Sequence, residues 1–341
     1  MTEAMQTPAE LEKEFYSKPF QFSYSSLNKL MYAPSAFYDW YVLKQKEDRT
    51  DPWLINGKII HCLILEPKNF EKQFLIQPGK VPTGNNKAIV DYMFNIQKTT
   101  KPEERRLKLA EYQPEIIHWL ETNNLHQKLT DDAKRMNKIL DPNNVTYFEF
   151  LQQAQEKTII DQESLDFCED AVKVVKKNAK ISDLMKIGQE GFELLSIDNE
   201  ILIDYQLKSR PFGLKGILDN LVVDYDKKVV YINDLKTTSK ALVKFEESVE
   251  FWNYWMQAAI YQRLALAHLL KNNVDVDTTW KVVFTFIVVD KYLQVYPFEV
   301  SNFTMSEWQK QLDGKLNEAK YHYENRDYSL PFKFVADQVL L

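Results

Sequence analysis

Three charged residues stand close together in the middle of the chain and could bind a metal ion. Asp219 lies in one apolar run, and Asp234 and Lys236 stand two residues apart in the next. A hard ion such as Mg²⁺ takes oxygen ligands, so two carboxylates beside a lysine suit it better than they suit a core. Such an ion polarises a phosphodiester and lowers the pKa of a bound water, and a lysine can orient the attacking hydroxide. For either acid alone, a turn residue or a surface ion pair explains the pattern equally well.

The two apolar runs are predicted to be neighbouring β-strands. Residues 218–224 and 229–235 are apolar and β-branched, and the four residues between them are few enough for a hairpin turn. Side chains two residues apart in a strand point to one face, so Asp234 and Lys236 are expected side by side. Further strands are predicted at 201–207, 279–289 and 294–300.

Two predicted helices carry other polar groups that could join this site. In the helix expected at 53–65, Gly57 and His61 are four residues apart and share one face. Alone, they suggest a close-packing glycine and a hydrogen-bonded histidine, but the downstream acids favour a metal ligand at His61. The helix expected at 246–270 presents Gln257 and Tyr261 on one face, which a plain amphipathic helix also explains.

In this order the motifs resemble the PD-(D/E)XK nuclease signature, and within it the RecB/RecE branch. Asp219 and the Asp234-Leu235-Lys236 run match the signature, while Gly57-x-x-x-His61 and Gln257-x-x-x-Tyr261 are similar to motifs of RecE-like nucleases (the exodeoxyribonuclease VIII type). The resemblance extends from about residue 23 to about residue 289. It implies an α/β fold with a restriction-endonuclease-like core, in which a central mixed β-sheet is flanked by helices and carries a helical insertion.

The resemblance also implies roles for individual residues. The implied metal ligands are His61, Asp219, Asp234 and the carbonyl of Leu235, with Mg²⁺ as the ion and Mn²⁺ as a substitute. Catalysis would use Asp219, Asp234 and Lys236. Relatives often place an assisting glutamate ahead of the strand pair, and Glu193 is preferred to Glu190 here, although a surface glutamate is an equal alternative. The implied DNA-binding or supporting residues are Lys215, Thr237, Thr238, Gln257 and Tyr261.

The activity that the resemblance implies is a Mg²⁺-dependent exonuclease acting on double-stranded DNA ends. It would digest from 5′ to 3′, leave 5′-phosphates, form a ring-shaped homo-oligomer and work with a single-strand annealing protein. A phage or prophage origin, with recombination or repair in the bacterial cytoplasm, is the expected setting. Two alternatives stay open: a catalytically silent protein that binds DNA ends or regulates a host nuclease, and an endonuclease of the same fold.

Composition bounds these expectations. The 341 residues are 45% hydrophobic and 27% charged, which indicates a globular protein, and we expect one nuclease domain over 1–341. Its expected parts are N-terminal helices at 22–76, a mainly helical excursion at 87–188 that includes one helix over 164–184, the catalytic sheet and helix at 189–300, and a C-terminal helix and tail at 301–341. The net charge is −6, yet residues 201–245 hold eight Lys or Arg against five Asp, and the local field decides DNA binding.

Several classes of cofactor and location are not expected. Only Cys62 and Cys168 occur, which indicates a reducing compartment and excludes a Cys₄ iron–sulfur cluster. The glycines form no nucleotide-binding motif, so no nucleotide cofactor is expected. The longest apolar stretch, 282–289, is too short to span a membrane.

Overall fold

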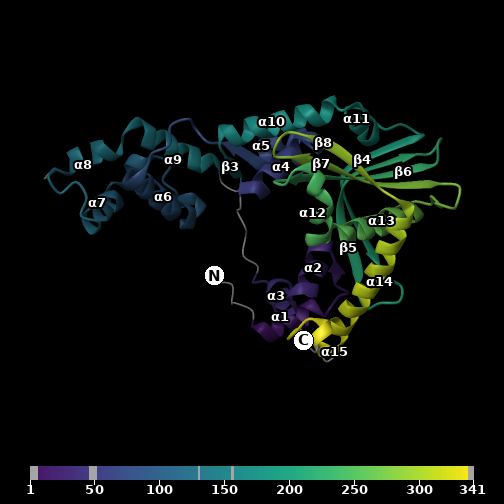
Figure 1. Cartoon of the computed structure of the whole chain (residues 1–341). Helices are drawn as coiled ribbons and strands as arrows, with labels where there is room; N and C mark the ends of the chain where they lie inside the picture. Colours follow the sequence, from purple (N-terminus) through teal and green to yellow (C-terminus); the bar gives the residue numbers. More distant parts are fainter. Residues whose placement is uncertain (1–6, 46–51, 130, 155–156, 337–341) are drawn as a thin grey trace. The chain divides into compact units, whose positions relative to one another are not determined.

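The computed structural model describes residues 7–45, 52–129, 131–154 and 157–336. The chain divides into two compact units (Figure 1). The first comprises Met1–Glu66 and Asp170–Leu341, and the second is Pro67–Glu169. The helical excursion expected at 87–188 thus overlaps the second unit, but its last part belongs with the first.

The first unit is built on a mixed β-sheet flanked by helices. In the described part of the chain the strand order is β1-β5-β6-β7-β8, and β4 pairs with β5. The β1–β5 and β6–β7 pairs are parallel, and the other neighbours are antiparallel. The strands are β1 (Gln21–Phe22), β4 (Leu195–Gln206), β5 (Gly213–Asp224), β6 (Val229–Thr238), β7 (Lys281–Asp290) and β8 (Val295–Val300). The expected α/β class with a central mixed sheet is confirmed.

The hairpins follow the pattern of the sequence. β5 and β6 pair from Asp224 and Val229 inward, so residues 225–228 form the turn that their length predicts. β7 and β8 pair in the same way, with Val289 opposite Val295. β7 is buried along nearly its whole length, as expected of an apolar strand that is covered on both faces.

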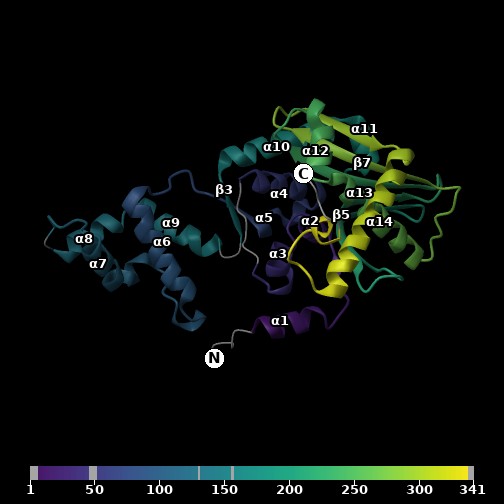
Figure 2. The same ribbon diagram turned by 60° about the horizontal axis from the view of Figure 1, so that its bottom comes forward.

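Helices cover both faces of this sheet. Val230 and Ile232 of β6 pack in one apolar core with Ala258 and Leu264 of α13 (Tyr254–Lys271). α4 (Pro52–Leu65) lies against β6 at Thr237, which belongs to the opposite set of alternating side chains. α14 (Asn302–Asn325) lies beside α13, and Figure 2 shows the two helices side by side.

Two of the long helices predicted from the sequence are each interrupted at an asparagine in the structure. The helix expected at 164–184 is α10 (Gln162–Lys177) followed by α11 (Ala179–Met185), and the side chain of Asn178 caps the second by accepting from Ile181 N at 3.2 Å. The helix expected at 246–270 is α12 (Phe245–Phe251) followed by α13. Asn253 separates them with a left-handed backbone at φ 55°, which ends one helix and starts the next in a new direction.

The N-terminal segment wraps aromatic residues around the core. α2 begins after Ser23, which forms a capping box with Ser26, and Phe22 and Phe37 are fully buried in the apolar core. The elements are α1 (Pro8–Phe15), α2 (Tyr24–Tyr32), α3 (Pro34–Phe37) and a π-helical turn (Tyr38–Val42).

The second unit has a core of its own. Ile89, Met93, Ile116 and Phe148 are fully buried in it, on helices α6, α7 and α9. Its elements are α5 (Phe70–Gln73), β2 (Phe74–Ile76), α6 (Gly84–Thr99), α7 (Gln113–Thr122), α8 (Asp132–Ile139), α9 (Pro142–Ala154), β3 (Thr158–Ile160) and the start of α10, and β2 pairs in parallel with β3. None of the described helices in either unit is long and apolar enough to cross a membrane.

Candidate metal centre

The centre lies where the sheet forks. β5 pairs with β1 at Gly213 and Leu214 and with β6 only from Asn220 onward. Within the described residues, the stretch 215–219 therefore has no strand beside it on that edge. Asp219 lies at the opening, and its Oδ2 accepts a hydrogen bond from Leu235 N at 2.7 Å. The carboxylate thus takes the place of a strand partner for the backbone of β6.

α4 packs against β6 through the Gly-x-x-x-His motif. A Cβ at Gly57 would lie 3.3 Å from Thr237 Oγ1, and His61 Nε2 lies 2.8 Å from the carbonyl oxygen of Leu235. Four residues of a helix advance about 6 Å, and two residues of a strand advance about 6.6 Å. The motif spacing therefore matches Leu235 and Thr237, and the glycine lets the helix approach closely.

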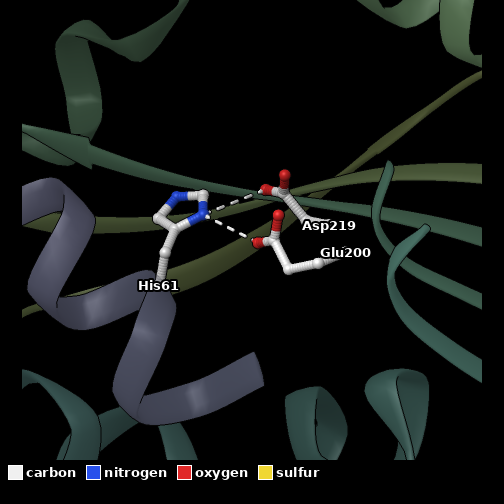
Figure 3. Close-up of side chains that lie close together, drawn as sticks. All are labelled: His61, Glu200 and Asp219. Carbon is white, nitrogen blue, oxygen red and sulfur yellow. Dashed lines mark ion pairs between the residues drawn. The ribbon is translucent and has the colours of Figure 1, made fainter. Parts of the chain in front are cut away.

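His61 faces two carboxylates on its other side (Figure 3). Its Nδ1 is 3.7 Å from Asp219 Oδ2 and 3.7 Å from Glu200 Oε1. One ligand atom from each of the three residues lies within 4.8 Å of the others. A carbonyl can only accept, so Nε2 donates to Leu235 and Nδ1 faces the acids. In the neutral ring that a metal requires, Nδ1 would offer its lone pair to the ion. Metal-binding histidines are commonly oriented by such a bond to a carbonyl, so this donor set fits a divalent cation.

Charge and burial act on His61 in opposite directions. Burial is the largest influence and lowers the pKa of the imidazole, but Asp219 and Glu200 together outweigh it, so the pKa is raised. The acids therefore attract positive charge to this point. A divalent ion satisfies that demand more fully than a single proton does.

Glu200 holds its place at a conformational cost. It stands between the register pairs Asn199–Asn220 and Ile201–Leu218, so it lies opposite Asp219 across β4 and β5. Its backbone is left-handed, with φ 49°, which costs a residue with a side chain about 1–2 kcal/mol. Strained positions of this kind cluster at functional sites, and here the strained residue carries one of the three donors.

Glu193 and Glu190, the residues expected to supply an assisting carboxylate, are not among the three residues that cluster at His61. Both residues are exposed in the segment that precedes β4, and the structure brings Glu200 to His61 and Asp219 instead. Sequence reasoning missed Glu200 because its role depends on the β4–β5 register. The available signal was weak, because Glu200 is one of three acids in β4 and precedes the strand predicted at 201–207.

Asp234 and Lys236 lie side by side on the α13 face of β6, as their spacing predicts. Asp234 is completely buried, and the Lys236 ammonium contacts its carboxylate. Gln257 Nε2 donates to Asp234 Oδ1 at 3.1 Å and to the Tyr261 hydroxyl at 2.9 Å. Burial, partly opposed by Lys236, raises the pKa of Asp234. The Gln-x-x-x-Tyr motif therefore supports Asp234.

The structure thus brings together only some of the four implied metal ligands. His61 and Asp219 meet, whereas the Asp234 carboxylate is held by Lys236 and Gln257, and the Leu235 carbonyl accepts from His61. Asp234 remains electrostatically coupled to both Asp219 and His61, which influence its pKa in opposite directions.

Three further residues with implied DNA-binding roles lie on β5 and β6. Thr237 lies against Gly57. Thr238 Oγ1 accepts from Lys240 N at 3.1 Å in the turn after β6. Lys215 is exposed on β5, opposite Asp204 of β4 in the register. The DNA-binding roles expected of these three residues stay predictions.

Comparisons with known proteins do not assign a family. No protein-family model matches the chain, and no curated protein matches it either. One similar solved structure is a protein from Eubacterium rectale described as a "putative exonuclease", with 12% identity and a TM-score of 0.45, covering 95% of this chain and 87% of that chain. Another, SSO0001, has 10% identity and a TM-score of 0.22, covering 76% of this chain and 98% of that chain. Likeness this remote carries no functional argument.

Proposed function

We propose that this protein is a metal-dependent deoxyribonuclease with a PD-(D/E)XK-type centre at the fork between β5 and β6. The observation that carries the proposal is the convergence of His61, Glu200 and Asp219 from α4, β4 and β5. Two of the three donors are carboxylates, which favours Mg²⁺, and Mn²⁺ is the expected substitute because it also accepts imidazole.

The chain's own groups hold the donors in place. Asp219 is fixed by the backbone N–H of Leu235, and His61 by the carbonyl of the same residue. When bound, the ion would polarise the phosphodiester and lower the pKa of a water molecule.

Lys236 is the proposed group that orients the attacking water and stabilises developing negative charge. Its ammonium contacts Asp234 and lies 5.1 Å from the centre of the Tyr254 ring. Gln257 holds the carboxylate of Asp234 from the other side. A lysine restrained by an acid and an aromatic ring is pre-organised, which is the property that electrostatic stabilisation needs.

The finer proposal is an exonuclease that digests double-stranded DNA ends from 5′ to 3′ and leaves 5′-phosphates. It includes a ring-shaped homo-oligomer and a single-strand annealing partner, in recombination or repair of phage type. What supports it is the resemblance of the four sequence motifs, in their order, to those of RecE-like nucleases. An endonuclease and a silent DNA-end-binding protein are the competing proposals.

The test uses the purified full chain with end-labelled linear duplex and covalently closed circular DNA. We expect linear DNA to be digested with Mg²⁺ or Mn²⁺ and to survive in EDTA. Asp219→Asn and Glu200→Gln should each lower the rate by about a hundredfold or more. Asp224→Asn is the matched control, because Asp224 is a buried acid on the same strand that bonds to Lys227 in the hairpin turn.

The outcomes separate the proposals. Digestion that survives Asp219→Asn contradicts the proposed site. Retarded DNA that stays uncut with either metal selects the silent protein, and cleavage of the closed circle selects the endonuclease. Release of label from the 5′ end before the 3′ end supports the proposed polarity.

A further inference from the structure

A row of asparagine side chains crosses three strands directly beside the acids. Asn199, Asn220 and Asn233 are register partners on β4, β5 and β6. We call this row the amide rung. The adjoining residue of each strand, taken in the same direction across the sheet, is Glu200, Asp219 and Asp234 in that order. A rung of amides therefore lies next to a rung of acids.

The amide rung is a continuous chain of hydrogen bonds. Asn220 Nδ2 donates to Asn199 Oδ1 at 2.8 Å, and Asn233 Nδ2 donates to Asn220 Oδ1 at 2.7 Å. Reversing any one amide would set two NH₂ groups or two oxygens against each other, so the three orientations depend on one another. Asn220 and Asn233 are the last paired residues of β5 and β6 before the two strands separate. The hydrogen bonds between these amides therefore lie directly beside the fork.

Both ends of the amide rung reach helix termini. Asn199 Nδ2 lies 3.4 Å from the carbonyl oxygen of Leu65, the last residue of α4. At the other end, Asn220 Nδ2 donates to Met185 O at 3.2 Å and Asn233 Nδ2 donates to Leu184 O at 3.1 Å, in the last turn of α11. Carbonyls at a helix C-terminus have no partner within the helix, so these side chains supply it. The rung thereby ties the helix that carries His61 to the strands that carry the acids.

Amides are an unusual choice for these positions. Asn220 and Asn233 are each 1% exposed, in a sheet whose buried positions are mostly apolar. Burying an amide is unfavourable unless its hydrogen bonds are made, and Asn220 uses both its N–H groups and its oxygen. Asn233 donates through Nδ2, but its buried Oδ1 has no hydrogen-bond partner among the described residues. A directional polar network fixes one register, whereas apolar side chains tolerate small shifts along the strand. The site gains a defined geometry from it.

We propose that the amide rung is a positioning device for the metal centre. It fixes the position of α4 along the sheet, and so the position of His61 relative to Glu200 and Asp219. It also keeps β5 and β6 paired as far as the residues next to Asp219 and Asp234. The inference rests on the proposed metal site and extends it to three residues that themselves touch no metal donor atom.

The experiment measures Mn²⁺ binding to the full chain by calorimetry and by electron paramagnetic resonance. Asn220→Leu keeps a similar volume and removes the central link. We expect the Kd for Mn²⁺ to rise by about 10- to 100-fold, as when partners that orient metal ligands are removed, and the resonance line shape of bound Mn²⁺ to change.

Asn144→Leu is the matched control. Asn144 is also 1% exposed, and its Nδ2 donates to Ile139 O at 2.9 Å in the second unit. Its loss removes a similar buried amide bond and should lower the melting temperature without changing the Kd. A purely structural role for the amide rung would make Asn220→Leu behave in the same way.

Asn199→Ala keeps the test decisive if Asn220→Leu does not fold. Asn199 is exposed at the edge strand, so its truncation leaves the core intact while it cuts the link to α4. A raised Kd in the folded variant supports the proposal. A wild-type Kd in every folded rung variant overturns it and leaves the proposed function standing, whereas absence of Mn²⁺ binding by the unmodified protein overturns both.

Discussion

The carboxylate of Asp219 accepts a hydrogen bond of 2.7 Å from the backbone N–H of Leu235, at the point where β5 and β6 separate. One oxygen of this acid therefore completes the backbone bonding of a neighbouring strand. The same oxygen lies 3.7 Å from His61 Nδ1. The hydrogen bond from Leu235 thus holds the Asp219 carboxylate in place without a bound metal ion.

Replacing Asp219 should have two separable effects. Asp219→Ala leaves the buried N–H of Leu235 without an acceptor, and an unsatisfied buried donor costs about 1–3 kcal/mol. Asp219→Asn retains an oxygen at that place, so it should be more stable than Asp219→Ala by about that amount. Urea unfolding in EDTA measures the difference, and equal stability of the two variants would show that the hydrogen bond contributes nothing.

Glu200 should be a position where glycine stabilises a strand. The backbone φ of Glu200 is 49°, which glycine adopts without the strain that a side chain causes. The free energy of unfolding of Glu200→Gly should therefore be about 1 kcal/mol higher than that of Glu200→Ala. Both variants lack the carboxylate, so both should bind Mn²⁺ more weakly than the unmodified protein. A glycine variant less stable than the alanine variant would contradict the left-handed backbone at this residue.

Removing Lys236 should destabilise the fold strongly, because Asp234 is buried against it. Lys236→Met leaves an unpaired buried carboxylate, which costs about 3–5 kcal/mol. Adding Asp234→Asn should recover part of that loss. Lys281→Met removes an exposed lysine 3.8 Å from Glu299 and should change stability by less than about 1 kcal/mol. Chemical denaturation of the four proteins checks this, and similar losses for the two lysines would refute it.

Gly216 should resist substitution because α13 lies directly over it. A Cβ there would be 2.9 Å from Tyr261 Cε1 and 3.0 Å from Leu264 Cδ1, and overpacking of this kind costs about 1–3 kcal/mol. Gly314 in α14 has nothing within 4 Å of such a Cβ, so Gly314→Ala should stabilise by about 0.5–1 kcal/mol. Thermal unfolding compares the two, and a neutral Gly216→Ala would mean that α13 moves away freely.

The strands and their hairpins could be predicted from local sequence because alternation and short turns are local properties. The runs at 229–235, 279–289 and 294–300 correspond to β6, β7 and β8. The helix breaks at Asn178 and Asn253 could not be predicted in this way, because the apolar periodicity continues through both residues. The Asn178 side chain caps α11 locally by accepting from Ile181 N. The Asn253 side chain accepts from Trp255 Nε1 and donates to Asn28 Oδ1, a residue far away in the chain.

The site was predictable as far as its motifs are local. His61, Asp234, Lys236, Gln257 and Tyr261 could be paired from spacing within a helix or a strand. Glu200 and the amide rung could not, because their roles arise from the register between β4, β5 and β6. That register is set by packing across residues far apart in the chain, and no single stretch of sequence contains it.

We expect a divalent ion to bind between α4, β4 and β5. Anomalous diffraction from a crystal soaked in Mn²⁺ would locate that ion. We predict a single strong peak bordered by His61 Nδ1 and the carboxylates of Glu200 and Asp219, which disappears in Asp219→Asn. A peak elsewhere, or an intact fork without one at saturating Mn²⁺, would contradict the account.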